Sequence, residues 1–329
     1  MKEALFYEKL EDKKVRCVLC PHNCMITEGD VGICKVRRNV EGKLISEAYG
    51  ELVTISMDPI EKKPLFHFYP GTTILSIGFN GCNFGCRYCQ NWRIAMEKVP
   101  TTTVTPQELV DITNRQNSNG IAFTYTEPVI GYEYIIDTAK IAKEDGVKIV
   151  LVTNGFINPE PLKKLLPYVD AMNIDLKSMD PNFYRKLCKG QLEPVLETIK
   201  IAHQNGVWVE ITYLVITAMN DRDQDIEKMV DFVAGVDKFI PVHLSRYFPA
   251  FKFKLSPTPI PTLRKAYEQA KGKLHYVYLG NVSMEGCENT FCPECGNTLI
   301  KRNLYTINVV GIEDHKCNRC GREVDIEGV

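Results

Sequence analysis

The strongest constraint on the fold is a regular alternation of strand and helix patterns through the middle of the chain. Short runs rich in β-branched and aromatic residues alternate with segments whose apolar residues recur at helical spacing. This alternation predicts a parallel sheet, because each helix returns the chain to the edge where the previous strand began. The expected strands are Ile74–Phe79, Ile121–Tyr125, Lys148–Val152, Ala171–Leu176, Val207–Val215, Val242–Arg246 and Tyr276–Leu279.

Helix signals separate these strands. Thr105-Pro106-Gln107-Glu108 offers an N-cap hydroxyl, a proline at the first helical position and a glutamate that can close a capping box. Apolar residues from Ile135 to Ala142 recur at helical spacing before Gly146, and Glu193–Asn205 and Gln224–Ala234 are similar. About six such units predict an α/β fold, a partial or complete (β/α) TIM-like barrel with its chemistry at the carboxyl ends of the strands.

Composition excludes several classes of protein. The chain has 329 residues, of which 44% are hydrophobic and 25% charged, so it can bury a full core. A net charge of −1 offers no broad basic field, which makes nucleic acid an unlikely partner. Without a signal segment at the start, or an apolar run of about 20 residues, we expect a cytoplasmic protein with no membrane contact.

Most of the thirteen cysteines fall into three tight groups, which in a long chain indicates metal ligation rather than disulfides. The groups divide the sequence into an N-terminal cysteine-rich metal-binding segment (1–50), a central barrel (51–285) and a C-terminal zinc-ribbon-like module (286–329).

The central group, Cys82, Cys86 and Cys89, has the spacing CxxxCxxC and follows the first expected strand. A closed zinc site or a fully protein-ligated cluster takes four ligands, so three cysteines indicate an iron–sulfur cluster with one iron left open. The alternative is a zinc loop completed by a distant residue such as Cys188.

This motif resembles that of the radical S-adenosylmethionine (SAM) superfamily, in which an aromatic residue precedes the last cysteine, as Tyr88 does here. The similarity extends over residues 50–285 and looks closest to the glycyl-radical (pyruvate formate-lyase) activating enzymes, and among them to the AmmeMemoRadiSam-system enzymes. The segments that carry it are Pro59–Leu65, Thr124–Pro128, Thr153–Gly155, Asp175–Lys177 and His243–Pro249.

The resemblance implies a [4Fe–4S] cluster, SAM and an external one-electron donor of the flavodoxin or ferredoxin type. It implies reductive cleavage of SAM to a 5′-deoxyadenosyl radical, which takes a hydrogen atom from a substrate. No catalytic residue is expected beyond the cluster and SAM. The residues expected to contact SAM are Tyr88, Thr126, Glu127, Thr153, Asn154, Asp175 and Lys177.

Each of these contacts has a structural alternative. Glu127 could be a helix N-cap, Thr153-Asn154 a plain turn, and Asp175 and Lys177 a strand-end ion pair, since alternation along a strand points both side chains to one face. Glu210 lies in a region that touches adenosine in relatives, or is a solvated charge.

The two outer cysteine groups each offer four thiols. Cys292, Cys295, Cys317 and Cys320 form two CxxC knuckles, which predict a structural zinc site with rubredoxin-like iron as the alternative. Cys17, Cys20, Cys24 and Cys34 predict a metal site whose occupant is zinc or an auxiliary iron–sulfur cluster.

Three functional hypotheses follow. The first is a radical SAM oxidoreductase that activates a protein by making a glycyl radical, or acts in the AmmeMemoRadiSam system with Memo-like and AMMECR1-like proteins. The second keeps the radical chemistry but takes RNA as substrate, read by the C-terminal module. The third is a metal-binding interaction protein without catalysis.

Overall fold

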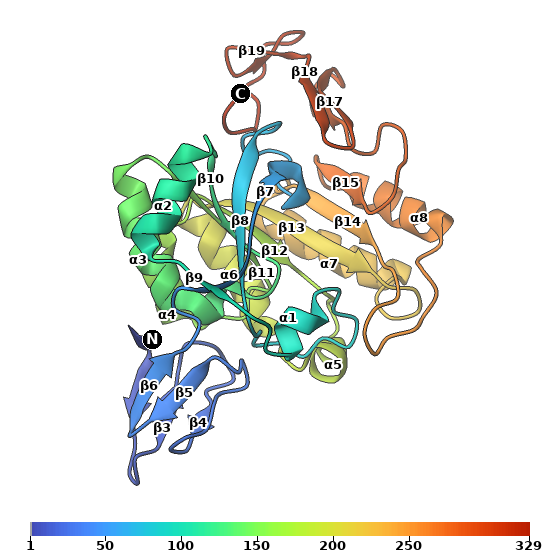
Figure 1. Ribbon diagram of the computed structural model, residues 1–329. Coiled ribbons are helices and arrows are strands. Elements are labelled where there is room, and N and C mark those ends of the chain that lie inside the picture. Colours follow the sequence, from blue (N-terminus) through green and yellow to red (C-terminus); the bar gives the residue numbers. More distant parts are fainter. Residues whose placement is uncertain (1) are drawn as a thin grey trace.

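A nine-stranded sheet forms the centre of the protein (Figure 1). The structure is a computed structural model and describes residues 2–329. The seven strands that the sequence predicts pair in parallel and in chain order, while β7 and β9 lie antiparallel at one edge. From edge to edge the strands are β15 (Val277–Gly280), β14 (Val242–Arg246), β13 (Trp208–Val215), β12 (Ala171–Asp175), β11 (Lys148–Thr153), β10 (Gly120–Phe123), β8 (Thr73–Phe79), β7 (Glu51–Pro59) and β9 (Thr102–Thr103).

The sheet does not close on itself. Within residues 2–329, β15 and β9 each have a partner on one side only, so the barrel is the partial form of the predicted architecture. Helices connect the parallel strands and cover the outer face (Figure 1). They are α2 (Pro106–Arg115), α3 (Tyr132–Glu144), α4 (Pro159–Leu165), α6 (Glu193–Gln204), α7 (Asp223–Val236) and α8 (Ile260–Lys271), with short helices α1 (Trp92–Met96) and α5 (Pro181–Phe183).

The helix start predicted at Thr105 is confirmed. Its hydroxyl accepts a hydrogen bond from the Glu108 backbone N–H, and the Glu108 carboxylate accepts from the Thr105 N–H, which completes a capping box.

Among the short segments, η1 (Ile60–Lys62), η2 (Pro128–Gly131) and η3 (Leu166–Tyr168) are 3₁₀ turns, and η4 (Tyr184–Cys188) is a π-helix. Within residues 2–329, no helix is long and apolar enough to cross a membrane.

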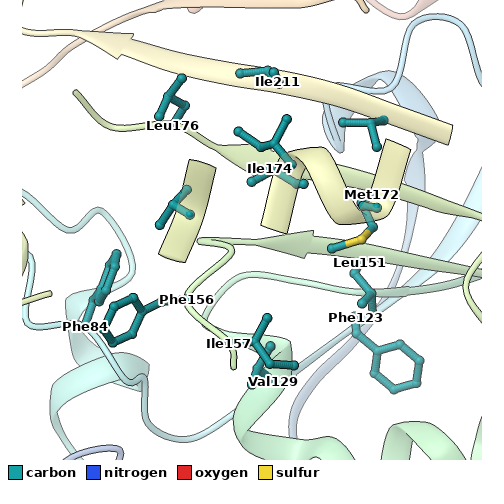
Figure 2. Close-up of a cluster of buried hydrophobic side chains, with 14 of the residues drawn as sticks. Phe84, Phe123, Val129, Leu151, Phe156, Ile157, Met172, Ile174, Leu176 and Ile211 are labelled. Carbon is teal, nitrogen blue, oxygen red and sulfur yellow. The ribbon is translucent and has the colours of Figure 1, made fainter. Parts of the chain in front are cut away.

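Apolar side chains fill the space between the sheet and the helices. Figure 2 shows Phe123, Leu151, Met172, Ile174 and Ile211, contributed by successive strands and packed in one cluster. Strand residues that alternate with these face the lumen and are largely polar, since successive side chains of a strand point to opposite faces. Asn173, Asp175, Glu210, Thr212 and His243 are among them. Polar side chains therefore gather inside the sheet, and an apolar layer lies between the sheet and the helices.

The segment after β7 closes the amino-terminal end of this lumen. Ile60, Leu65 and Phe68 pack against Ala122 and Val150 on the sheet. We call residues 60–72 the plug. Access to the lumen is thereby limited to the carboxyl ends of the strands, where the chemistry of parallel barrels is found.

Two small modules lie at opposite ends of the barrel (Figure 1). The N-terminal one consists of two three-stranded sheets, and the C-terminal one of a three-stranded sheet with a short hairpin. Their strands are β1 (Lys2–Glu3), β6 (Lys43–Ser46) and β5 (Arg37–Val40), then β2 (Tyr7–Lys9), β3 (Val15–Cys17) and β4 (Met25–Ile26), and finally β16 (Thr290–Phe291), β17 (Thr298–Asn303), β18 (Thr306–Val309), β19 (Ile312–Glu313) and β20 (Lys316–Cys317).

The C-terminal module is attached to the plug by backbone and side-chain bonds. The Tyr69 N–H donates to the Glu327 carbonyl at 2.9 Å, and the Glu327 N–H donates to the His67 backbone carbonyl at 2.8 Å. The buried Arg302 guanidinium donates to the Phe66 carbonyl at 2.6 Å and to the Thr290 hydroxyl at 2.7 Å. This module therefore helps to hold the plug in the barrel.

Arg302→Met should lower the free energy of unfolding by about 2–4 kcal/mol, because it leaves buried acceptors without their charged donor. Lys301→Met, at the exposed neighbouring position on β17, is the matched control and should change stability by less than about 0.5 kcal/mol. Urea unfolding of both variants measures the difference. Equal stabilities of the two variants would show that Arg302 does not hold the module to the plug.

Candidate functional site

The three central cysteines lie on a loop that follows β8 at the carboxyl end of the sheet. Backbone hydrogen bonds hold this loop against the end of η4. The Gly85 N–H donates to the Cys188 carbonyl at 2.8 Å, and the Arg87 N–H donates to the Leu187 carbonyl at 3.0 Å. Phe84 packs on Phe156 with ring centroids 5.0 Å apart, a contact also visible in Figure 2. These contacts hold the loop against η4 and Phe156.

The thiols of Cys82, Cys86 and Cys89 do not lie at the spacing of one tetrahedral metal ion. A tetrahedral zinc ion with bonds of about 2.3 Å would place its sulfurs about 3.8 Å apart. Within residues 2–329, no set of three ligands that includes these cysteines has all its ligand atoms within 4.8 Å of one another. The cluster held by the three cysteines and the zinc site completed by Cys188 therefore both stay predictions.

Cys188 nevertheless lies beside the loop. The Tyr88 hydroxyl is 3.2 Å from the Cys188 sulfur, and both side chains are buried. Burial raises the pKa of Tyr88 well above its ordinary value, and the Cys188 thiol adds to the effect. In this arrangement the Tyr88 hydroxyl points to Cys188, and its contact with SAM stays a prediction.

Asp175 and Lys177 form an ion pair next to this loop, with Nζ 3.0 Å from the carboxylate. This confirms that both side chains point to one face. The Lys177 N–H donates to the Tyr184 hydroxyl at 3.0 Å, and the Lys177 carbonyl accepts from the Asn220 amide at 2.8 Å. Burial acts to lower the pKa of Lys177, but the Asp175 carboxylate and the Cys86 sulfur raise it well above its ordinary value. Lys177 is thus a cation held in place by Asp175, Tyr184 and Asn220.

The predicted SAM-contacting residues on β10 and β11 form one hydrogen-bonded chain. The Glu127 carboxylate accepts from the Thr153 hydroxyl, the Asn154 N–H and the Val129 N–H, at 2.7, 2.7 and 3.0 Å. The Asn154 amide in turn donates to the Asn83 side chain at 2.8 Å, directly beside Cys82. Burial raises the pKa of Glu127 to about 7. These side chains therefore position the cysteine loop, and the SAM contacts expected of them stay predictions.

Thr126 also bonds within the protein. Its hydroxyl donates to the Phe79 carbonyl, the last residue of β8, at 2.9 Å. This bond joins the carboxyl ends of the first two parallel strands where the cysteine loop begins. Thr126 remains half-buried, so its SAM contact also stays a prediction.

The expectation that Glu210 contacts adenosine is wrong. Its carboxylate is fully buried near the plug and accepts from the Phe66 and His67 N–H groups, at 3.0 and 2.8 Å. His243 Nε2 lies 2.6 Å from the same carboxylate. Burial acts to raise the pKa of Glu210, but the hydrogen bond and charge of His243 lower it overall. Glu210 binds the plug, at the end of the lumen away from the cysteines.

Sequence reasoning missed a second charged cluster in the lumen. Asp58 at the end of β7 is bound by Lys63 at 2.7 Å, by Lys62 at 2.7 Å and by the Tyr125 hydroxyl. Lys63 is buried, with its ammonium 4.5 Å from the centroid of the Tyr125 ring. The sequence does contain a run of charged residues within Pro59–Leu65 that could have indicated this cluster. It does not show that these side chains point into the lumen.

The four C-terminal cysteines have the spacing of a site for a single metal ion. Cys292 and Cys320 have sulfurs 3.7 Å apart, as do Cys295 and Cys317. All four sulfurs lie within 4.8 Å of one another, close to the distance of about 3.8 Å that a tetrahedral ion requires. The structure brings together the four residues that the sequence grouped, and this group could hold a metal ion.

The four N-terminal cysteines also come together. Cys17, Cys20, Cys24 and Cys34 line one cavity beside the loop of the central cysteines. Burial raises the pKa of the Cys34 thiol to about 11 in the metal-free chain.

These features define an α/β-barrel protein that gathers three cysteines and a charged pair at the carboxyl ends of its parallel strands. The family model of the radical SAM superfamily matches residues 76–233. Uncharacterized protein MJ0808 of Methanocaldococcus jannaschii is 46% identical over 334 residues, 99% of each chain. Pyruvate formate-lyase 1-activating enzyme of Escherichia coli K12 is 27% identical over 192 residues, 56% of this chain and 78% of that protein.

A solved structure supports the fold. A radical SAM methyltransferase from Sphaerobacter thermophilus matches with a TM-score of 0.51 at 17% identity, over 70% of this chain and 71% of that one. This chain belongs to the radical SAM superfamily. Membership implies an enzyme that binds a [4Fe–4S] cluster and SAM and that uses an electron donor.

Asp58→Asn should lower the free energy of unfolding at pH 7, because it leaves the buried Lys63 unpaired. Burial acts to raise the pKa of Asp58, but Lys62, Lys63 and Tyr125 hold it well below its ordinary 3.8. A lowered folded-state pKa stabilises the protein above pH 3.8, and this contribution is lost as the pH falls further. The difference from wild type, measured by urea unfolding, should therefore narrow below that pH.

The control is Asp231→Asn, which removes an exposed ion pair with Lys273 and should have little effect at any pH. A stability difference for Asp58→Asn that stays constant down to pH 2 would contradict the assignment, because it would mean that ionisation of Asp58 contributes nothing.

Proposed function

We propose that this enzyme cleaves SAM reductively at a [4Fe–4S] cluster held by Cys82, Cys86 and Cys89, and that the resulting radical takes a hydrogen atom from a substrate. The observation that carries the proposal is the Asp175–Lys177 ion pair at the carboxyl end of β12, the same end of the sheet as the cysteine loop after β8. When bound, the cluster and SAM supply a one-electron cleavage that yields the 5′-deoxyadenosyl radical.

The chain's own residues bind and orient SAM. Lys177 offers three N–H donors to a carboxylate, and Asp175 offers acceptors to an ammonium group, which are the two charged groups of the methionyl part of SAM. Both charges lie in the lumen, where a partner of opposite charge offsets the cost of burial. The plug blocks the other end of the lumen, so SAM and substrate enter from the side of the cysteine loop.

For the substrate we propose a protein on which a glycyl radical is made, or a substrate of the AmmeMemoRadiSam system handled with Memo-like and AMMECR1-like proteins. The support is the similarity to pyruvate formate-lyase activating enzymes of E. coli and Clostridium pasteurianum. The external reductant would be a flavodoxin or ferredoxin.

The two other hypotheses have less support. An RNA substrate read by the C-terminal module would have to reach the cysteine loop from the opposite end of the barrel (Figure 1). A non-catalytic role would leave Asp175 and Lys177 as a strand-end ion pair only, and it would not account for the match to the radical SAM family model. For the C-terminal module we propose a structural zinc, because four thiolates leave no open position.

Anaerobic reconstitution of the full chain with iron and sulfide, followed by SAM and dithionite, should produce 5′-deoxyadenosine, measured by liquid chromatography. Cys86→Ala should abolish the product, because it removes one of the three cluster ligands. The control variant Cys287→Ser changes a cysteine outside the three groups, and it should still form 5′-deoxyadenosine. A wild-type enzyme that carries the cluster and binds SAM but forms no 5′-deoxyadenosine would overturn the proposed chemistry.

Lys177→Met should weaken SAM binding by about 10–100-fold, the loss expected for one charge-assisted hydrogen bond. The control variant is Lys186→Met, which makes the same substitution at an exposed lysine of η4 outside the lumen. Equilibrium dialysis of the cluster-loaded proteins measures the dissociation constants. Equal SAM affinities for the two variants would remove Lys177 from the SAM site.

A further inference from the structure

We propose that a basic groove beside the cysteine loop is the docking surface for a small acidic electron-transfer protein of the flavodoxin or ferredoxin type. The groove has a volume of about 710 Å³. Its lining comes from Gly85 and Arg87 of the loop, from α1, from η4 and the residue after it, and from Phe251 and Lys252. The inference rests on the proposed function, because a cluster on this loop is what requires an external reductant.

The groove carries a concentration of positive charge in a chain whose net charge is −1. Its lining has five cations and one acid, Glu97. The five cations are Lys35, Arg87, Lys186, Lys189 and Lys252, all of them exposed. Within residues 2–329 none of the five forms an ion pair, whereas an exposed lysine such as Lys164 is paired with Glu160. Because like charges repel one another, an acidic protein surface that docks here removes an unfavourable interaction.

Two aromatic rings give the groove an apolar wall. Trp92 on α1 stacks on Phe251, with ring centroids 5.1 Å apart and an angle of 14° between the ring planes. Both side chains are half-buried, so part of each ring is accessible. In a protein interface, charges steer the partner and apolar contact at the centre holds it. The groove therefore offers both parts of a docking surface.

The groove borders the cysteine loop directly. Gly85 and Arg87 flank Cys86 in the chain, and both line the groove. The Lys189 side chain lies against Gly85, where an added Cβ would be 3.2 Å from the lysine Cγ. The Lys252 N–H donates to the Arg87 carbonyl at 3.0 Å. A protein seated here would contact the residues on both sides of Cys86, which we propose as a cluster ligand.

The position of the groove suits an electron donor better than a substrate. Among residues 2–329, those that line the groove do not include the lumen residues Asp175 and Lys177. A substrate has to reach the lumen, where we propose that SAM binds. The donor loses one electron from its flavin or iron–sulfur centre, and the cluster gains it, so no atom of the donor has to enter the barrel.

The first experiment measures binding of the donor. The test variant K186E/K252E reverses two exposed charges of the groove, and the control K140E/K228E makes the same change at exposed lysines of α3 and α7. Calorimetric titration of the cluster-loaded full chain uses an oxidised bacterial flavodoxin and, separately, an oxidised bacterial ferredoxin at low ionic strength. At least one donor should bind to wild type. Its affinity should fall about tenfold in K186E/K252E and less than about twofold in K140E/K228E.

The second experiment measures electron transfer without SAM. The reduced donor is mixed with each cluster-loaded protein, and its reoxidation is followed by stopped-flow absorbance. The rate for wild type and K140E/K228E should fall steeply as salt is added, because salt screens the attraction. K186E/K252E should be slow at every salt concentration. Circular dichroism and iron content should be the same for all three proteins.

Equal donor affinities and equal reoxidation rates for the two double variants would overturn the proposal. Failure of both donors to bind wild type would also overturn it. A single-stranded RNA that binds wild type but not K186E/K252E and displaces the donor would instead assign the groove to nucleic acid, since basic grooves with aromatic rings also bind single strands. Absence of 5′-deoxyadenosine with dithionite in all three proteins would refute the proposed function, while donor binding and reoxidation would still decide the role of the groove.

Discussion

The carboxylate of Glu210 is the interaction on which the arrangement of the barrel depends. A buried carboxylate costs several kcal/mol unless donors satisfy it, and Glu210 receives the Phe66 and His67 N–H groups as well as His243. These donors come from the plug and from β14, so the charge is compensated only when the plug occupies the lumen. The plug in turn provides the Phe66 carbonyl and the His67 backbone that receive the C-terminal module. One buried charge therefore couples the barrel, the plug and this module.

Closing one end of the lumen determines where chemistry can take place. The open end carries the cysteine loop, the Asp175–Lys177 pair and the Glu127–Asn154–Asn83 chain of hydrogen bonds. The loop is held by backbone bonds to η4 and by Asn83. A loop held by such contacts loses less conformational entropy when it binds a ligand.

Local patterns in the sequence predicted most of the barrel, and long-range contacts explain what they missed. The parallel strands and the Thr105 capping box follow from periodicity and from neighbouring residues, so they were visible. The antiparallel β7 was not, because its sequence alternates apolar with polar residues and lies outside the strand–helix repeat used to find the others. The role of Glu210 was hidden because its donors are 143 and 144 residues away in the chain. The pairing of Asp175 with Lys177 was predicted because both lie on one strand end.

The cysteines show what the spacing of a motif can predict and what it leaves open. Both outer groups contain a CxxC pair, and on this basis either could bind zinc. In the folded chain the C-terminal sulfurs converge to 3.7 Å in pairs, because the knuckle after β16 faces the knuckle after the β19–β20 hairpin. The N-terminal cysteines are Cys17 at the end of β3 and three residues on the connections before β4 and β5, and they line one cavity with Arg37. The metal that each group suits therefore depends on how the surrounding strands place the ligands, and this placement depends on packing that no cysteine motif encodes.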